Sequence, residues 1–114
     1  MSHEAFDSLP LHDATLISLE VLWEQSVARL HLNVWSVAEG RSVPRVLHFS
    51  GVKAVQIPMA RPWGPSGSVN SASWVAGMYN IEMQSGDIIS VSAESYSLLP
   101  SNISLQPTAL TGRG

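Results

Sequence analysis

Short runs of alternating apolar and polar residues recur along the chain. In residues 14–23 one side of the alternation is apolar and the other polar, and residues 27–37 repeat the pattern. Because successive side chains of a strand point to opposite faces, each run predicts a strand with one buried face. We expect the two runs to form a hairpin. The apolar positions of the first run, predicted to face the core, are Ile17, Leu19, Val21 and Trp23.

The register of this hairpin follows from the same alternation. The apolar faces match only if odd positions of the first strand pair with even positions of the second. Glu20 then lies opposite Arg29 or His31 on the outer face, and the connecting turn has an even number of residues.

Residues 38–44 are a loop by composition, and residues 46–57 form a third apolar run interrupted at Ser50-Gly51. This run predicts two short strands or one bent strand. Val55 and Ile57 are expected to face inward, and Pro58 ends the pairing because proline lacks a backbone donor.

A second hairpin is predicted from residues 79–84 and 88–96 around Ser85-Gly86-Asp87. A three-residue connection, with Gly86 in a conformation that favours glycine, places Ile81 and Met83 on the same face as Ile89 and Val91. Residues 71–77, small side chains around Trp74, have no clear period and stay unassigned.

No segment has a helical period, so the sequence predicts an all-β fold: a single antiparallel sandwich or small barrel of about six strands. Residues 1–100 are expected to form this domain. Residues 101–114 are polar and without period, and they predict a flexible C-terminal tail that contributes little to stability.

Composition adds an expectation about partners. Charged residues make up 13% of the chain and hydrophobic residues 45%, which indicates apolar surface shared with a protein partner or a second copy, a homodimer being plausible. The net charge of −3 and the scattered six Lys and Arg residues argue against nucleic acid as a partner.

The chain has no cysteine, which excludes a disulfide framework and a thiolate nucleophile. The first residues lack the charged and apolar regions of a signal peptide, and no apolar run is long enough to span a membrane. These features lead us to expect a cytoplasmic protein with no membrane association.

The segment from Pro62 to Asn70, Pro-Trp-Gly-Pro-Ser-Gly-Ser-Val-Asn, combines residues that fix a loop without a helix or a ladder. Two interpretations are open. The segment is a connection pinned by a buried Trp63, or it is a preorganised recognition loop.

Three motifs resemble those of known proteins. They are His12-Asp13-Ala14, the segment from Pro62 to Asn70 that contains Trp63, and residues 81–87, Ile-Glu-Met-Gln-Ser-Gly-Asp. Together they resemble a family of short uncharacterised bacterial proteins, over most of residues 9–96. The layout is also similar to small all-β immunity proteins of bacterial toxin systems. Residues 104–108 are similar to the translated ends of mobile integron gene cassettes, and this likeness implies that the tail reflects gene context.

Catalytic and metal sites find little support in the sequence. His3, His12 and Asp13 with Glu4 or Asp7 have no recognised metal-ligand spacing. A Ser66 or Ser68 nucleophile would need His12 and Asp13, but adjacent residues of a strand point to opposite faces. Glu82 and Glu94 would need a cleft for glycoside chemistry. No cofactor, metal ion or catalytic residue is therefore predicted.

The predicted recognition surface is defined by rigid loop geometry and polar side chains. Its residues are Trp63, Ser66, Asn70, Glu82 and Gln84, with His12 and Asp13 at its edge. Trp35 lies on the polar side of its strand and is a further candidate for contact with a partner or ligand.

These observations favour a non-enzymatic binding protein that recognises a protein partner, as an immunity or adaptor module does. The alternative is a small-molecule-binding barrel or an enzyme with a pocket near Trp63.

Overall fold

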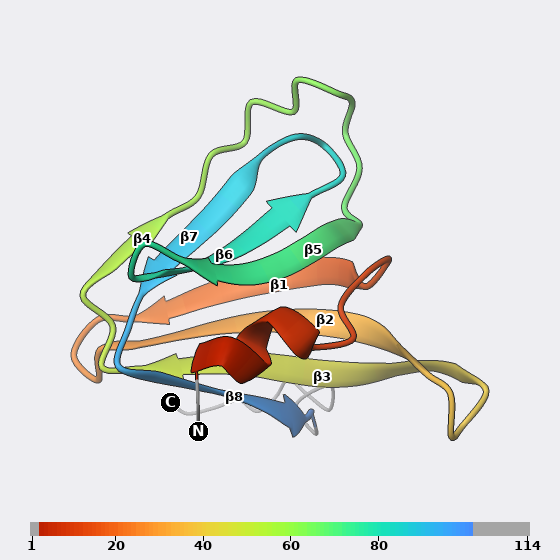
Figure 1. Ribbon diagram of the computed structural model, residues 1–114, viewed down its shortest axis with the longest axis horizontal. Helices are drawn as coiled ribbons and strands as arrows, with labels where there is room; N and C mark the ends of the chain where they lie inside the picture. The colour runs from red at the N-terminus through yellow and green to blue at the C-terminus, as the bar shows by residue number, and fades with distance from the viewer. Residues whose placement is uncertain (1–2, 102–114) are drawn as a thin grey trace, which may run out of the picture.

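The computed structural model describes residues 3–101 and shows an all-β fold, as the alternation predicts (Figure 1). Two four-stranded antiparallel sheets have the orders β1-β2-β3-β8 and β4-β7-β6-β5. A 3₁₀ helix precedes them. The elements are η1 (His3–Ser8), β1 (Thr15–Leu22), β2 (Val27–Ser36), β3 (Arg41–Ser50), β4 (Ala54–Gln56), β5 (Val69–Val75), β6 (Met78–Met83), β7 (Ile88–Ser92) and β8 (Ser95–Pro100).

Two chain segments bend from one sheet into the other. The chain leaves β3 at Gly51, where φ is +65°, and enters β4. The second segment is the connection from β7 to β8, which lies beside the connection from β3 to β4. Backbone bonds from Lys53 N–H to Ser92 O (2.7 Å) and from Glu94 N–H to Ser50 O (3.0 Å) continue the pairing across the bend. Of the two alternatives expected for residues 46–57, two short strands or one bent strand, the structure shows two strands, β3 and β4, on either side of Gly51.

The start of β1 joins the two sheets at the opposite corner. Leu16 N–H donates to Gly67 O at 2.9 Å, and Val69 N–H donates to Ala14 O at 2.8 Å. A single bridge pairs Thr15 with Ser68. Beyond Leu16, β1 is hydrogen-bonded only to β2 within the described strands, so the sheets separate there.

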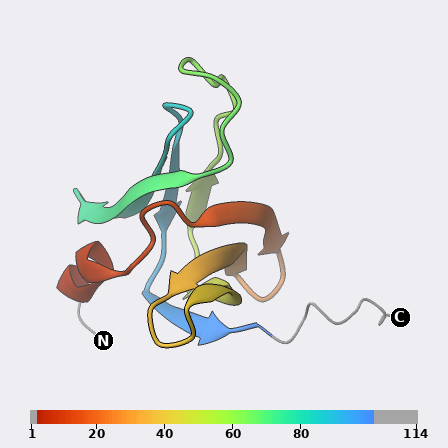
Figure 2. The same cartoon turned by 90° about the vertical axis from the view of Figure 1, so that its right-hand side faces the viewer.

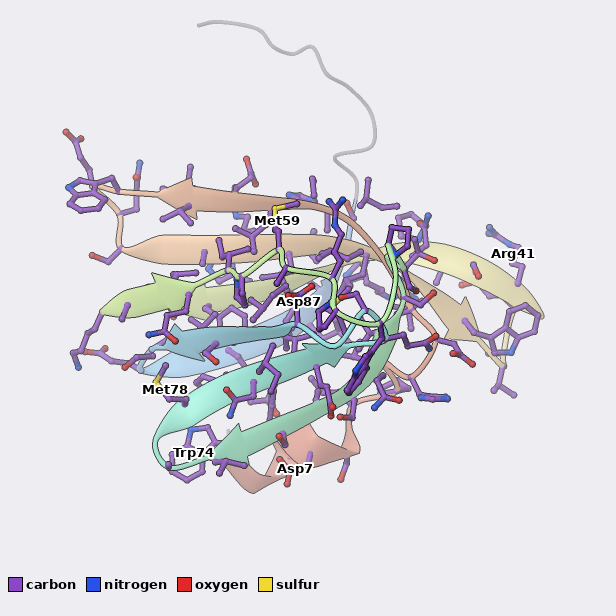
Figure 3. The ribbon with its side chains drawn as sticks, turned by 90° about the horizontal axis from the view of Figure 1, so that it is seen from above. Asp7, Arg41, Met59, Trp74, Met78 and Asp87 are labelled. Carbon is purple, nitrogen blue, oxygen red and sulfur yellow. The ribbon has the colours of Figure 1, made fainter. Side chains whose placement is uncertain are left out.

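The core lies between the sheets, and η1 closes one side of it (Figures 1 and 2). Phe6 is fully buried among the rings of Phe49, Tyr79 and Tyr96, with centroids 4.9–6.1 Å from its own. A carboxylate oxygen of Asp7 accepts the backbone N–H of Trp74 in β5 at 2.8 Å, and the two residues lie near each other in Figure 3. This short helix was not anticipated from the sequence.

The predicted inward face of the first strand is partly wrong. Ile17 is 60% exposed, Val21 46% and Trp23 86%. A bulge at Ile17 shifts the register, because Leu16 pairs with Leu32 whereas Ser18 pairs with His31. The strand then ends at Leu22, and Trp23 begins the turn.

Three further assignments need correction. Residues 71–77, left unassigned, lie mostly in β5, which ends at Val75. The predicted loop at residues 38–44 overlaps β3; Pro44 fits there because β3 pairs with β8 only from Arg45 onward. Ile57 lies beyond the end of β4 and is 43% exposed, because the strand is only three residues long.

In both hairpins the predicted odd–even relation between paired residues is confirmed. Glu20 lies opposite Arg29 across an even-length turn, residues 23–26. In the second hairpin Ile81 lies opposite Ile89, and both are buried. The expected division into a domain of residues 1–100 and a tail of residues 101–114 stays a prediction. The predicted tail lies outside the described residues except for Ser101.

Within residues 3–101, no helix has the length and apolar character needed to cross a membrane.

Candidate functional site

The connection between β4 and β5 arches over the β6–β7 turn in both views of the ribbon (Figures 1 and 2). Asp87, a buried residue of that turn, holds the connection in place. Its carboxylate accepts the backbone N–H groups of Ala60 (2.9 Å) and Arg61 (2.9 Å) and the Ser85 hydroxyl (2.8 Å). Figure 3 shows Asp87 beneath the arch.

The electrostatics of Asp87 follow from these bonds. Burial by itself would raise the pKa of this carboxyl group. The bonds from Ser85, Arg61 and Ala60 to the ionised form outweigh burial, and the pKa lies below its ordinary value. The connection is therefore fastened by a carboxylate whose two oxygens both accept hydrogen bonds from this chain.

Trp63 lies near the middle of this connection in the sequence, between Gln56 at the end of β4 and Val69 at the start of β5. Its backbone N–H donates to Ser85 O at 2.9 Å, and its ring packs against Gly86: a Cβ atom there would lie 2.9 Å from Trp63 Cδ2. The residue is nevertheless 71% exposed. Of the two interpretations of this segment, a connection pinned by a buried Trp63 does not hold.

Polar side chains next to Trp63 bond to one another and to backbone. His12 Nδ1 donates to the carbonyl oxygen of Asn70 at 2.7 Å, and His12 Nε2 lies 3.5 Å from Asp13 Oδ2. Gln84 Nε2 donates to Asp13 Oδ1 at 2.6 Å and to Val69 O at 3.2 Å. This network fixes the orientation of the side chains before any partner arrives.

Five of the residues expected to form the recognition surface line one shallow hollow of about 420 Å³: His12, Asp13, Trp63, Asn70 and Gln84. We call these five residues the Trp63 surface. Asp13 has a φ of +68°, an uncommon conformation for a residue other than glycine. Strained residues of this kind often cluster where a protein binds.

The remaining predicted residues lie apart from this hollow. The Ser66 hydroxyl accepts the backbone N–H of Ser68, and Ser66 lines a neighbouring hollow under the arch. Glu82 accepts a bond from the Ser71 hydroxyl at 3.1 Å. Trp35 is 59% exposed and lines a hollow with Pro10 and Val37.

Sequence reasoning missed the supporting role of the Ser85-Gly86-Asp87 turn. The turn itself was expected from its composition. The carboxylate of Asp87 accepts bonds from the backbone of residues 60 and 61, which lie 27 and 26 residues away in the sequence. No local sequence pattern reveals contacts between residues so far apart.

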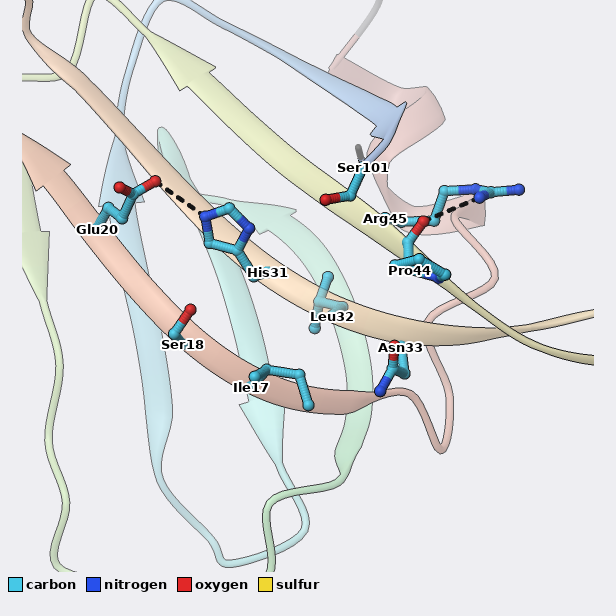
Figure 4. Close-up of a pocket in the computed structure, with 9 residues that line it drawn as sticks. All are labelled: Ile17, Ser18, Glu20, His31, Leu32, Asn33, Pro44, Arg45 and Ser101. Carbon is cyan, nitrogen blue, oxygen red and sulfur yellow. Dashed lines mark hydrogen bonds and ion pairs between the residues drawn. The ribbon is translucent and has the colours of Figure 1, made fainter. Parts of the chain in front are cut away.

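A second hollow lies on the outer face of the β1–β2–β3 sheet (Figure 4). Across it, His31 Nε2 lies 2.9 Å from Glu20 Oε1, and Arg29 Nη1 lies 3.6 Å from the same oxygen. The bond from His31 is the main reason that the pKa of Glu20 is lowered. These contacts are the cross-strand pairs expected of His31 on an outer face.

The arrangement offers little for catalysis. The Ser66 hydroxyl is bonded to backbone and His12 to Asn70 O, so the two do not form a nucleophile and base pair. Among the described side chains no group of three or more His, Asp and Glu residues could hold a metal ion. The side chains of His3 and Glu4 lie outside the described part.

Comparisons of the chain with protein-family models, with curated proteins and with solved structures returned no match. The resemblance drawn from the three motifs therefore stays a prediction.

Proposed function

We propose that this chain is a non-enzymatic binding protein that recognises a protein partner through the Trp63 surface. One observation carries the proposal. A largely exposed tryptophan is held at a fixed position, next to polar side chains that are already hydrogen-bonded to one another.

This arrangement resembles the hot spot of a protein–protein interface. Tryptophan is among the residues most enriched there, and polar groups typically surround the apolar centre. Small-molecule sites are instead concave enclosures that bury most of the ligand. The hollow beside Trp63 is open and contains one carboxylate, that of Asp13, which favours the contact of one protein with another.

Preorganisation supports the same conclusion. Binding costs free energy when loops and side chains must be ordered. Here the arch is already fixed by the Asp87 bonds and by Trp63 N–H to Ser85 O. A partner can therefore bury the indole ring without first ordering the loop that carries it.

The finer parts of the proposal rest on the sequence. The likeness to immunity proteins suggests that the partner is a bacterial toxin or an adaptor target. The absence of cysteine is in keeping with a cytoplasmic location, and the likeness of residues 104–108 to the translated ends of gene cassettes suggests an integron cassette origin. Self-association through the exposed apolar residues belongs to the same proposal.

An affinity capture from the host, followed by calorimetry with the purified partner, tests the proposal. We expect Trp63→Ala to weaken binding by about 30-fold or more, as for a hot-spot residue. Trp63→Phe should retain much of the affinity. Val75→Ala is the control, because Val75 is 56% exposed and lies outside both the Trp63 surface and the hollow beside Trp35.

Two results would count against the proposal. One is a protein partner whose affinity is the same for the wild type and for Trp63→Ala. The other is a bound metabolite in the native protein with no protein partner, which would favour the small-molecule alternative.

A further inference from the structure

The two sheets separate along β1 and β4 and leave an apolar groove between them. Two adjoining hollows, of about 530 and 400 Å³, share Ile57 and together follow the length of β1. We call this feature the β1–β4 groove. Its apolar lining includes Leu19, Val21 and Trp23 on the β1 side and Val55, Ile57 and Met59 on the other. In Figure 3, Met59 points from the arch toward β1.

Exposed apolar side chains gather along this groove. Val21 is 46% exposed, Trp23 86%, Ile57 43% and Met59 67%. Ile17 adds a fifth such side chain from the bulge of β1. Contiguous exposed apolar residues on a soluble domain mark an interaction site rather than a random surface.

Both walls of the groove are strand edges. β1 ends one sheet and β4 ends the other. The pairing of β1 with residues 67–69 stops at Leu16, so within the described chain residues 18–22 have a free edge. A free edge is a template for an added strand. The bulge at Ile17 and Pro58 after β4 limit that pairing to a short segment.

The charges at the ends of the groove indicate which segment fits. Lys53 lines the hollow at the end of β1, and Arg61 lines the hollow near its start. Neither forms an ion pair among the described residues. Asp87, the one acidic side chain in the lining, is buried, accepts bonds from Ala60 N–H, Arg61 N–H and the Ser85 hydroxyl, and also interacts with the charge of Arg61. Lys53 and Arg61 are exposed, so the groove presents a basic side chain near each end and apolar surface between them.

We propose that the β1–β4 groove binds a short extended segment of a partner protein, apolar in its middle and acidic at both ends, which adds a strand to the free edge of β1. The segment's carboxylates would lie near Lys53 and Arg61. Its apolar side chains would cover Val21, Ile57 and Met59. This site is separate from the Trp63 surface, and its test does not depend on the proposed function.

Two other occupants fit the groove less well. Residues 102–114 of this chain contain no Asp or Glu, so they cannot supply the acidic ends. A second copy that paired symmetrically about the middle of residues 18–22 would place Glu20 opposite Glu20 of the other copy, and like charges directly opposite each other destabilise a strand pair.

Titration of the full-length protein with blocked seven-residue peptides, followed by amide NMR shifts, tests the proposal. The probe alternates valine and threonine and carries glutamate at each end; a matched probe carries lysine at each end. We expect saturable shifts at residues 18–22 and 54–56, with the acidic probe bound at least about tenfold more tightly. The double variant Lys53→Glu, Arg61→Glu should reverse this preference.

Val21→Lys places a charge in the groove and should abolish binding, whereas Val75→Lys, at an exposed position outside the groove, should not. The proposal is overturned if the two probes bind equally, if shifts centre on the Trp63 surface, or if no saturable binding occurs at millimolar peptide. It is also overturned if native mass measurement shows a dimer whose residues 18–22 are protected from hydrogen exchange without peptide.

Discussion

At the scale of single residues, the candidate site depends on a glycine. Gly86 has a φ of +95°, a region that favours glycine, and its α-carbon faces the undersides of Pro62 and Trp63. Asp87 next to it fastens the arch through backbone bonds. The exposure of Trp63 therefore results from two neighbouring positions in another part of the chain.

We expect Gly86→Ala to lower the free energy of unfolding by about 1 kcal/mol or more beyond the effect of Gly77→Ala. Both glycines have positive φ, and an alanine there costs about 1–2 kcal/mol. Only at Gly86 would the added Cβ lie 2.7 Å from Pro62 Cγ, while Gly77 faces open space. Urea unfolding measures both variants, and equal losses would contradict the contact between the turn and the arch.

At the scale of elements, β1 and β2 are linked by a cross-strand group on their outer face. Glu20 lies between Arg29 and His31, and its partner in the register is Arg29. The odd–even pairing of the hairpin predicted from the sequence that Glu20 would lie opposite Arg29 or His31. The bulge at Ile17, which the sequence did not reveal, leaves this part of the register unchanged and places Leu16 rather than Ile17 opposite Leu32.

The lowered pKa of Glu20 predicts a pH dependence of stability. Because the pKa in the folded state lies below the ordinary value of 4.5, the ionised carboxylate stabilises the fold above that value, and the contribution is lost as pH falls through the folded pKa. We expect Glu20→Gln to lower stability at pH 7 by less than about 1 kcal/mol, since the group is partly exposed.

Thermal unfolding of this variant between pH 7 and pH 3 checks the expectation. The difference from the wild type should shrink toward zero in acid. Glu39→Gln is the control, because Glu39 pairs only with Arg41 in an exposed turn. A difference that stays constant across this pH range would show that the carboxylate's charge has no part in the effect.

At the scale of the whole molecule, η1 completes the core. The two sheets converge on Phe6, which contacts rings from β3, β6 and β8. The same sheets separate along β1 and β4 on another side of the molecule. One opening of the sandwich is thus filled by the chain itself, and the other is left as the β1–β4 groove.

We expect Phe6→Ala to lower the free energy of unfolding by about 3–5 kcal/mol, because it removes a fully buried ring and leaves a cavity. Phe6→Leu should cost clearly less, since leucine fills more of the space than alanine. Urea unfolding monitored by tryptophan fluorescence gives both values. A loss below about 1 kcal/mol for Phe6→Ala would mean that η1 does not hold the core.

The sequence by itself determined the all-β class and the parity of both hairpins, and it grouped five of its eight candidate residues that do lie together, those of the Trp63 surface. These features depend on alternation and on turn residues, which are local properties. Alternation failed at Ile17, because of a bulge, and at Trp23, because the strand ends before it; both features are set by pairing with β2 rather than by neighbours in the chain.

Only the tertiary structure decided the rest. Trp63 is exposed because Gly86 and Asp87 hold the arch from beneath, and Phe6 is buried because three distant strands close around it. The β1–β4 groove exists because β1 pairs with residues 67–69 only at its start. The physical reason is the same in each case: burial and edge pairing depend on which segments meet in space, and hydrophobic periodicity records only which face of a segment is apolar.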